Sequence, residues 1–456
     1  MIAHFRVMKQ FLCGLVFLAA LPLSAQDKYV LVTAPANVQS VCGRHGLTEI
    51  TQLSSHGVFL VSTFSPDSAI ATDPDVQSFE PDRALAVPEL SGTTIASLTQ
   101  STTSILDSLP GRSVVSYFGS KVASNYVQQP ATAITRQRAA QAAVNLTGSG
   151  ITVAVIDTGV DPSHPALSAV LVPGYNFINE AASPSELNDL DPARAAALTQ
   201  STTSILDAQN LVQLNTFTLA ILTQSTTSIL DGSPGAFGHG TMTAGVVHLF
   251  APGARIMPLK AFAADGSSDL FNILRAIYHA ADHGANVISM SFEILQSSPS
   301  LQSAIQYALS RNVVVVASAG NDARKILVFP AAYNDVIGVG STSNADAKSS
   351  FTNFGTNAVF VAAPGEGLIT TYPGGNYAAG WGTSFSAPLV AGEAALVLQA
   401  RPSYRPGDVR NAVSRGIDVS DMGHGRVDFC LALSHIGIGT FCGSTSGGSS
   451  GGPSAP

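Results

Sequence analysis

The chain has 456 residues, enough for two or three domains, and 22 Lys and Arg against 30 Asp and Glu give a formal charge of −8. Charged residues make up 11% and hydrophobic residues 45%, which excludes a disordered polyelectrolyte and leaves ample apolar side chains for a large core. A nucleic-acid partner is not expected, because phosphate contacts need clustered Lys and Arg and this acidic chain has no basic run.

The N-terminal residues have the three-part pattern of a secretory signal. Arg6 and Lys9 precede an apolar run at 11–23, and a small-residue cleavage site follows at 23–25. The alternative is a membrane anchor, but a spanning helix needs roughly 20 apolar residues. We therefore expect residues 1–25 to be a signal peptide, the protein to be secreted, and no membrane span to remain after signal removal.

A small α/β unit is predicted next, at 26–83. Its expected strands and helix lie at 29–32, 37–45 (the helix), 57–63 and 76–82. With about 60 residues it is near the lower limit for independent folding. Residues 84–124 are rich in Ser and Thr without clear periodicity, and we predict a linker there.

The larger unit is predicted at 125–434, followed by a flexible Gly/Ser-rich tail at 435–456. Apolar runs alternate with helical stretches, of which the clearest are the runs 151–156, 286–290, 313–317, 336–339 and 358–362 and the helices 270–283 and 299–311. Apolar strands without polar alternation indicate a mainly parallel sheet with helices on both faces. The expected fold is doubly wound α/β, with its ligands at the carboxyl ends of the strands.

One segment occurs three times, at 96–107, 196–207 and 220–231, with the pattern Ala-x-Leu-Thr-Gln-Ser-Thr-Thr-Ser-Ile-Leu-Asp. Copies so far apart cannot stack as a solenoid. The first lies in the linker, and the other two lie in 179–234, which we expect to be a surface insertion. We favour duplicated surface segments without chemistry, and a recognition role is the alternative.

The cysteines are Cys13, Cys42, Cys430 and Cys442. Removal of the signal takes Cys13, and loss of a further N-terminal segment would take Cys42. The remaining two are twelve residues apart and could close a small loop in an oxidising compartment. Two unpaired thiols are the alternative.

Three short segments carry residues suited to catalysis. Asp157 ends the apolar run 151–156, which puts a carboxylate at the carboxyl edge of the sheet. His239 stands in Gly-His-Gly-Thr at the start of a helix, and Ser384 stands in Gly-Thr-Ser-x-Ser-Ala-Pro near another helix N-terminus, where N–H groups stabilise negative charge. Taken singly, each has an ordinary structural explanation, such as a helix cap.

In the order Asp, His, Ser, the three segments resemble the subtilisin-like serine proteases, over roughly residues 125–433. The resemblance implies that Asp157 orients His239 and that His239 takes the proton of the Ser384 nucleophile, giving an acyl-enzyme. Asn321, in Ser-Ala-Gly-Asn-Asp after the run 313–317, is implied to donate its amide to the oxyanion beside the Ser384 N–H. No cofactor is implied.

The N-terminal unit is similar to the propeptides of these proteases in its strand order and its Val-x-x-x-Glu-Pro-Asp ending at 76–82. The resemblance implies a zymogen whose own propeptide is an intramolecular inhibitor, with cleavage near 110–130.

The sequence departs from the family in three places. Asp157 and His239 are 82 residues apart, wider than usual. The calcium-binding loop that many relatives insert after the position of Gly245 is absent, so no calcium is predicted there and no metal site is assigned. The segment 291–294, Ser-Phe-Glu-Ile, stands where relatives commonly have Ser-Leu-Gly-Gly, so Glu293 puts the usual preference for large apolar side chains in doubt.

Residues that bind the substrate are predicted on both sides of a groove. Gly266 belongs to an edge where a peptide would add as an extra strand, and Ser291, Phe292 and Gly320 are assigned to the opposite side.

The leading hypothesis is thus a secreted serine endopeptidase that acts on proteins or peptides. A catalytically silent binding or surface protein on the same fold is the alternative, suggested by the insertion, the repeats and the altered wall. A non-peptidase hydrolase ranks last, because Ser384 lacks a Gly-x-Ser-x-Gly elbow.

Overall fold

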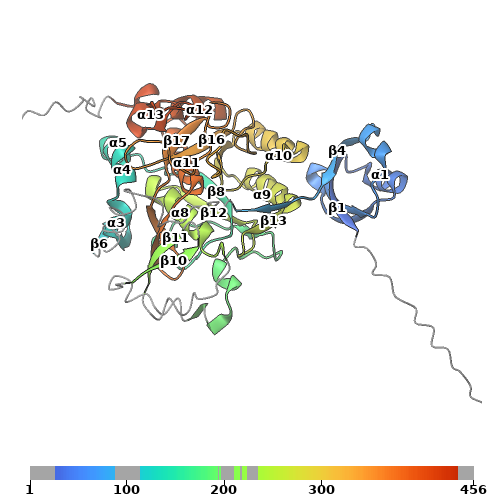
Figure 1. The fold of residues 1–456 in the computed structure, drawn as a ribbon, viewed down its shortest axis with the longest axis horizontal. Helices are drawn as coiled ribbons and strands as arrows, with labels where there is room; N and C mark the ends of the chain where they lie inside the picture. The colour runs from blue at the N-terminus through green and yellow to red at the C-terminus, as the bar shows by residue number, and fades with distance from the viewer. Residues whose placement is uncertain are drawn as a thin grey trace, which may run out of the picture.

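The computed structural model describes residues 26–87, 113–193, 195–196, 210–215, 218–222 and 235–439. A small N-terminal unit, blue in Figure 1, lies beside helices α9 (Leu270–Asp282) and α10 (Pro299–Ser310) of a larger unit. The expected signal peptide, the first repeat and residues 440–456 of the expected C-terminal tail lie outside the described residues.

The N-terminal unit is a four-stranded antiparallel sheet with one helix, α1 (Val38–His45). Its strands, in spatial order, are β2 (Thr48–Leu53), β3 (Val58–Thr63), β1 (Asp27–Thr33) and β4 (Val76–Pro81). Three strands and the helix match the sequence prediction. Strand β2 was not predicted, because its residues are mostly polar and exposed and so lack an apolar pattern.

A nine-stranded sheet forms the centre of the larger unit. In spatial order it contains β20 (Gly416–Ile417), β21 (Arg426–Val427), β17 (Val361–Pro364), β16 (Ile337–Thr342), β15 (Val314–Ser318), β14 (Val287–Met290), β8 (Thr152–Asp157), β12 (Arg255–Lys260) and β9 (Tyr175–Asn176). All neighbouring strands are parallel except β20 and β21. The predicted mainly parallel α/β fold is therefore confirmed.

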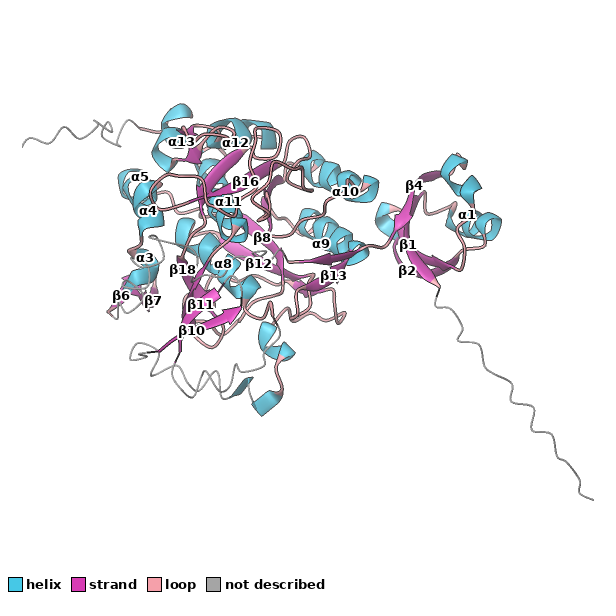
Figure 2. Ribbon diagram, viewed as in Figure 1, coloured by secondary structure: helices cyan, strands magenta, loops and turns pink. Residues whose placement is uncertain are grey.

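Helices cover both faces of this sheet (Figure 2). The central strand β8 alternates between them: Val153 and Val155 belong to the buried cluster of α8 (His239–Phe250) and α11 (Thr383–Ala400), whereas Ala154 and Ile156 belong to that of α9 and α10. Side chains on successive residues of a strand point to opposite faces, so an all-apolar strand fits between two helix layers.

The remaining described elements surround this centre. The helices are α3 (Ser124–Val127), α4 (Pro130–Ile134), α5 (Gln137–Val144), α12 (Pro406–Val413) and α13 (Phe429–His435), and the short strands β6 (Val114–Tyr117) and β7 (Ser120–Ala123) form a hairpin. No helix among the described residues is long and apolar enough to cross a membrane. Cys42 is buried as a free thiol, whereas Cys430 is disulfide-bonded.

Part of the expected insertion 179–234 joins a second sheet. Strands β10 (Asn210–Asn215) and β11 (Thr218–Leu222) form a hairpin, and β11 pairs antiparallel with β19 (Asn376–Gly380), which pairs with β18 (Leu368–Tyr372). The strand pair β18–β19 directly precedes α11, so the insertion adds strands next to the element that carries Ser384.

Candidate active site

Asp157 and His239 meet at the carboxyl edge of the central sheet. Asp157 is the last residue of β8, and its Oδ1 lies 2.7 Å from Nδ1 of His239, the first residue of α8. A carboxylate can only accept, so the contact places the proton on Nδ1 and leaves Nε2 as the basic nitrogen. Both side chains are buried, and the second carboxylate oxygen accepts from the Thr243 hydroxyl at 3.2 Å.

The glycine after His239 allows this approach. A Cβ built on Gly240 would lie 2.1 Å from the carbonyl oxygen of Gly159, so any larger residue would push α8 away from the loop after β8. Gly238, before the histidine, has φ +89°, a conformation that side chains disfavour. The Gly-His-Gly pattern therefore has a steric cause.

Ser384 is the second residue of α11, and its side chain is buried. The ring of its neighbour Phe385 lies 5.7 Å from that of His239, between centroids. The Ser384 carbonyl oxygen accepts from the Ser291 hydroxyl at 2.9 Å, which fixes the backbone. Its Oγ makes no hydrogen bond to any described residue, His239 included.

Two N–H donors converge next to this serine. Asn321 follows β15, and its Oδ1 accepts from the backbone N–H and hydroxyl of Thr383 at 2.9 and 3.0 Å. A Cβ built on Gly382 would lie 3.4 Å from Nδ2, 3.7 Å from Oδ1 and 3.8 Å from the Ser384 nitrogen, so the Asn321 amide and the Ser384 nitrogen border the same space beside Gly382. The arrangement suits a negatively charged oxygen.

A strand of this chain occupies the predicted groove. Strand β5 (Ala84–Ala86) pairs antiparallel with β13 (Ser267–Asp269), and the N–H of Val87 donates to the Gly266 carbonyl at 2.9 Å. On its other side Ala86 forms an antiparallel bridge with Glu293. Residues 84–87, inside the expected linker, are thus ordered between the two walls.

The predicted wall residues contribute in different ways. Ser291 holds the Ser384 backbone, and the backbone N–H of Gly320 donates to the Thr383 hydroxyl at 3.2 Å. The Phe292 side chain instead faces the core and packs on Phe262, so only its backbone is available to a peptide. Burial, followed by the neighbouring charge of Asp322, raises the pKa of Glu293 to about 7.

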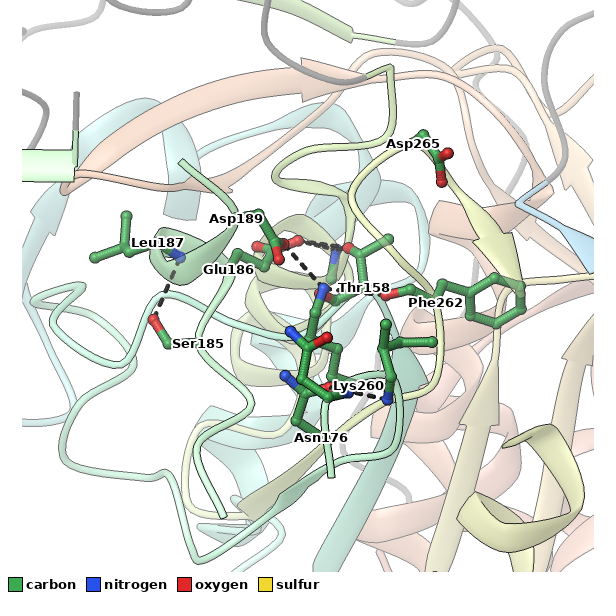
Figure 3. Close-up of polar contacts among 12 residues, drawn as sticks. Thr158, Asn176, Ser185, Glu186, Leu187, Asp189, Lys260, Phe262 and Asp265 are labelled. Atoms are coloured by element: carbon green, nitrogen blue, oxygen red, sulfur yellow. Dashed lines mark hydrogen bonds and ion pairs between the residues drawn. The ribbon is translucent and has the colours of Figure 1, made fainter. Parts of the chain in front are cut away.

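Sequence reasoning missed a buried polar group behind the Asp157–His239 pair, shown in Figure 3. Glu186 and Lys260 are fully buried there, with Thr158 between them. The detectable signal was Lys260, a lysine at the end of strand β12. Glu186 gave no signal, because its partners lie more than 25 residues away along the chain.

Metal-ligating groups are not evident in the parts of the chain that the structure describes: no three His, Cys, Asp or Glu side chains gather there in a way that suits an ion. His279 and His283 stack on each other with centroids 3.8 Å apart. Helix α8 runs without interruption past Gly245 to Phe250.

Comparison with known proteins agrees with this geometry. The family model described as the subtilase family, Peptidase S8, matches residues 148–429, more than half of the chain. This span contains Asp157, His239, Asn321 and Ser384. The fold and the match define the class as serine protease, and the chain belongs to the subtilase family.

Individual relatives cover the same region. The thermophilic serine proteinase of Bacillus sp. (strain AK1) is 33% identical over 303 residues, 63% of this chain and 62% of that protein. Thermitase of Thermoactinomyces vulgaris is 32% identical over 274 residues, 59% of this chain and 82% of that protein. The chain thus spans less than two thirds of the first relative and most of the second.

A solved structure extends the likeness in fold beyond this region. The crystal structure of fervidolysin from Fervidobacterium pennivorans, described as a keratinolytic enzyme related to subtilisin, superposes with a TM-score of 0.62 at 21% identity. It covers 92% of this chain and 62% of that chain.

Proposed function

We propose that this chain is a secreted serine endopeptidase, made as a zymogen, that hydrolyses peptide bonds of proteins or peptides. The observation that carries the proposal is the 2.7 Å contact between Asp157 Oδ1 and His239 Nδ1, with the buried, unpartnered Ser384 hydroxyl on the adjacent helix. A hydroxyl, an imidazole and an orienting carboxylate are the groups that acyl transfer at neutral pH needs.

The proposed mechanism assigns one task to each group. Ser384 Oγ attacks the carbonyl carbon of the scissile bond while His239 Nε2 takes its proton. Asp157 stabilises the resulting imidazolium, and Asn321 Nδ2 with the Ser384 N–H binds the oxyanion. His239 then returns the proton to the leaving amine, and water, activated by the same imidazole, hydrolyses the acyl-enzyme and frees the hydroxyl.

The substrate is proposed to bind as a strand between β13 and Glu293, as β5 does. In the antiparallel register of Ala86 with Glu293, a peptide would run on toward Ser291, whose hydroxyl contacts Ser384. Strand addition lets the main chain provide affinity and the side-chain pockets provide selectivity. Because β5 occupies the same place, residues 26–87 are proposed to inhibit the enzyme until they are cleaved off.

The test compares wild-type protein with Ser384→Ala. We expect the wild-type chain, expressed with residues 1–25, to appear outside the cell in a shortened form that cleaves peptides. The Ser384→Ala chain should fold but remain unprocessed and inactive. N-terminal sequencing of the secreted protein identifies the signal and maturation sites. Substantial peptide hydrolysis by Ser384→Ala would refute the assignment.

The silent binding protein remains the second candidate, suggested by Glu293 and by strands β10 and β11 beside α11. A serine-directed phosphonate separates the two functions, since it labels only an activated hydroxyl. Labelling of matured wild-type protein at Ser384, absent in Ser384→Ala, is expected for the peptidase. Matured protein without label supports the silent function.

A further inference from the structure

We propose that Glu186 is a positioning residue that sets the geometry and charge of the Asp157–His239 pair. The inference rests on the proposed function, because it concerns the same residues. Glu186 starts a short 3-10 helix (Glu186–Asp189) in the segment expected to be a surface insertion, yet it is fully buried. Its role therefore differs from that of a surface loop residue.

The backbone around Glu186 is tied to the loop that follows Asp157. The Val160 N–H donates to the Pro184 carbonyl at 3.0 Å, and the Glu186 N–H donates to the Val160 carbonyl at 3.0 Å. Val160 lies three residues after Asp157 in the same loop. The two segments thus run side by side in parallel, which brings the Glu186 side chain toward α8.

The Glu186 carboxylate accepts hydrogen bonds from the start of the histidine helix. Backbone N–H groups of Gly238, Gly240 and Thr241 donate to it at 3.2, 3.3 and 3.1 Å, and the Thr241 hydroxyl also donates. These N–H groups have no acceptor within the helix, and a negative charge at this end is favourable. His239 lies between the residues that Glu186 holds.

Thr158 connects the same carboxylate to Asp157. Its hydroxyl lies 2.5 Å from Glu186 Oε1 and 3.3 Å from Asp157 Oδ1, and it accepts from the Gly240 N–H at 2.8 Å. A hydroxyl has one proton, and the shorter contact assigns it to Glu186. Glu186, through Thr158, therefore fixes the loop of Asp157 against the helix of His239.

A buried lysine compensates the charge. Lys260 Nζ donates to the Thr158 carbonyl at 2.6 Å, the Phe262 carbonyl at 3.0 Å and Asp189 Oδ2 at 2.9 Å, as Figure 3 shows. Burial raises the pKa of Glu186, whereas the hydroxyl donors and Lys260 act in the opposite direction. Five donors point at the two carboxylate oxygens, and three of them are backbone N–H groups that cannot act as acceptors, which favours the ionised form.

Two consequences follow for catalysis. Loss of the carboxylate leaves buried N–H groups without an acceptor, so the first turn of α8 and its imidazole should shift. It also removes a negative charge near His239 and leaves Lys260 less compensated, and both changes disfavour the imidazolium. The pKa of His239 should therefore fall, and turnover should drop more than substrate binding.

The experiment compares matured Glu186→Gln and Glu186→Ala with wild type, after titration of active sites. We expect kcat to fall roughly 10- to 100-fold with KM within about twofold. The acid limb of the kcat/KM profile should move to lower pH. Glu180→Gln is the matched control: Glu180 lies six residues earlier, its side chain is 60% exposed, and it pairs with Arg275. This control should leave all three quantities unchanged.

A second readout does not need activity. In the Ser384→Ala background, NMR titration of the His239 imidazole should give a lower pKa when Glu186→Gln is added. An unchanged His239 titration together with unchanged kcat would overturn the proposal. If wild-type protein is inactive, the proposed function fails, and the imidazole titration still decides the role of Glu186.

Because Glu186 is buried, its variants could fail to fold, and Thr158→Val then serves as the second variant. Valine keeps the volume and removes only the hydroxyl that joins Glu186 to the loop of Asp157. The His239 titration should shift in the same direction by a smaller amount. No shift in folded Thr158→Val would contradict the proposed link.

Discussion

The N-terminal sheet and the nine-stranded sheet both carry apolar residues on both faces. They differ in which parts of the molecule cover those faces. The nine-stranded sheet is covered by helices of its own unit. The N-terminal sheet covers one face with α1, through Leu31 and Phe59, whereas Val30 and Leu60 of its other face belong to the buried cluster of α9 and α10. The smaller unit therefore completes its core only by docking on the larger one.

Polar contacts of His56 and Glu80 also hold the docked face, and we call them the polar seam. His56 Nε2 contacts Asp282 Oδ2 at 2.7 Å, and its ring stacks on Tyr278 with centroids 4.2 Å apart. Glu80 Oε1 accepts from the Ser298 hydroxyl and the Ser300 N–H, both at 2.9 Å, at the start of α10. The contact combines apolar burial with a carboxylate at a helix N-terminus, and both stabilise the docked position of the small unit.

The largest expected effect is a loss of stability that distinguishes the two faces of the N-terminal sheet. Phe59→Ala should cost about 3–5 kcal/mol, since Phe59 is fully buried under α1, and a unit of this size should then unfold. Leu60→Ala, one residue on, should loosen docking and leave the sheet formed. Hydrogen exchange of residues 26–87 in the full Ser384→Ala chain measures both. Equal loss of protection in the two variants would contradict the distinction.

A smaller effect is expected at the seam. Glu80→Ala removes the acceptor of two hydrogen bonds from the docked face, and we expect this loss to weaken docking by about 1.5–3 kcal/mol. Residues 26–87 should then be cleaved at least tenfold faster by an added protease, measured in the Ser384→Ala chain. Glu49→Ala, away from α10, is the matched control and should leave that rate unchanged. If both variants are cleaved at the wild-type rate, Glu80 does not hold the two units together.

The same contrast explains what the sequence could predict. Buried strands such as β14 and β15 are mostly apolar, so their pattern predicted them. The motifs around Asp157, His239 and Ser384 are local, so the sequence alone could propose them as a site. Strand β12 was not predicted, because Arg255 and Lys260 stand at its ends and Pro258 interrupts the short apolar run between them. Glu186 could not be found, because its function depends on donors from two other segments that only the fold brings together.

The smallest expected effect is a pH dependence of stability at Glu293, which forms a β-bridge with Ala86. Its pKa is raised from an ordinary value of 4.5 to about 7, so between these values the folded state binds more protons than the unfolded state. Stability contributed by this group is therefore present at low pH and is lost as pH rises through 7. Relative to the Ser384→Ala parent, Glu293→Gln should gain stability from pH 5 to pH 8.

Urea unfolding at several pH values in that range measures this difference. Asp421→Asn makes the same charge change on an exposed carboxyl, 56% exposed in its side chain, and serves as control. A difference between Glu293→Gln and its parent that stays constant with pH would mean that Glu293 titrates normally. A rising difference, seen only for Glu293→Gln, would locate the cost of a buried carboxylate in the wall of the groove, where a bound peptide with a cationic side chain would relieve it.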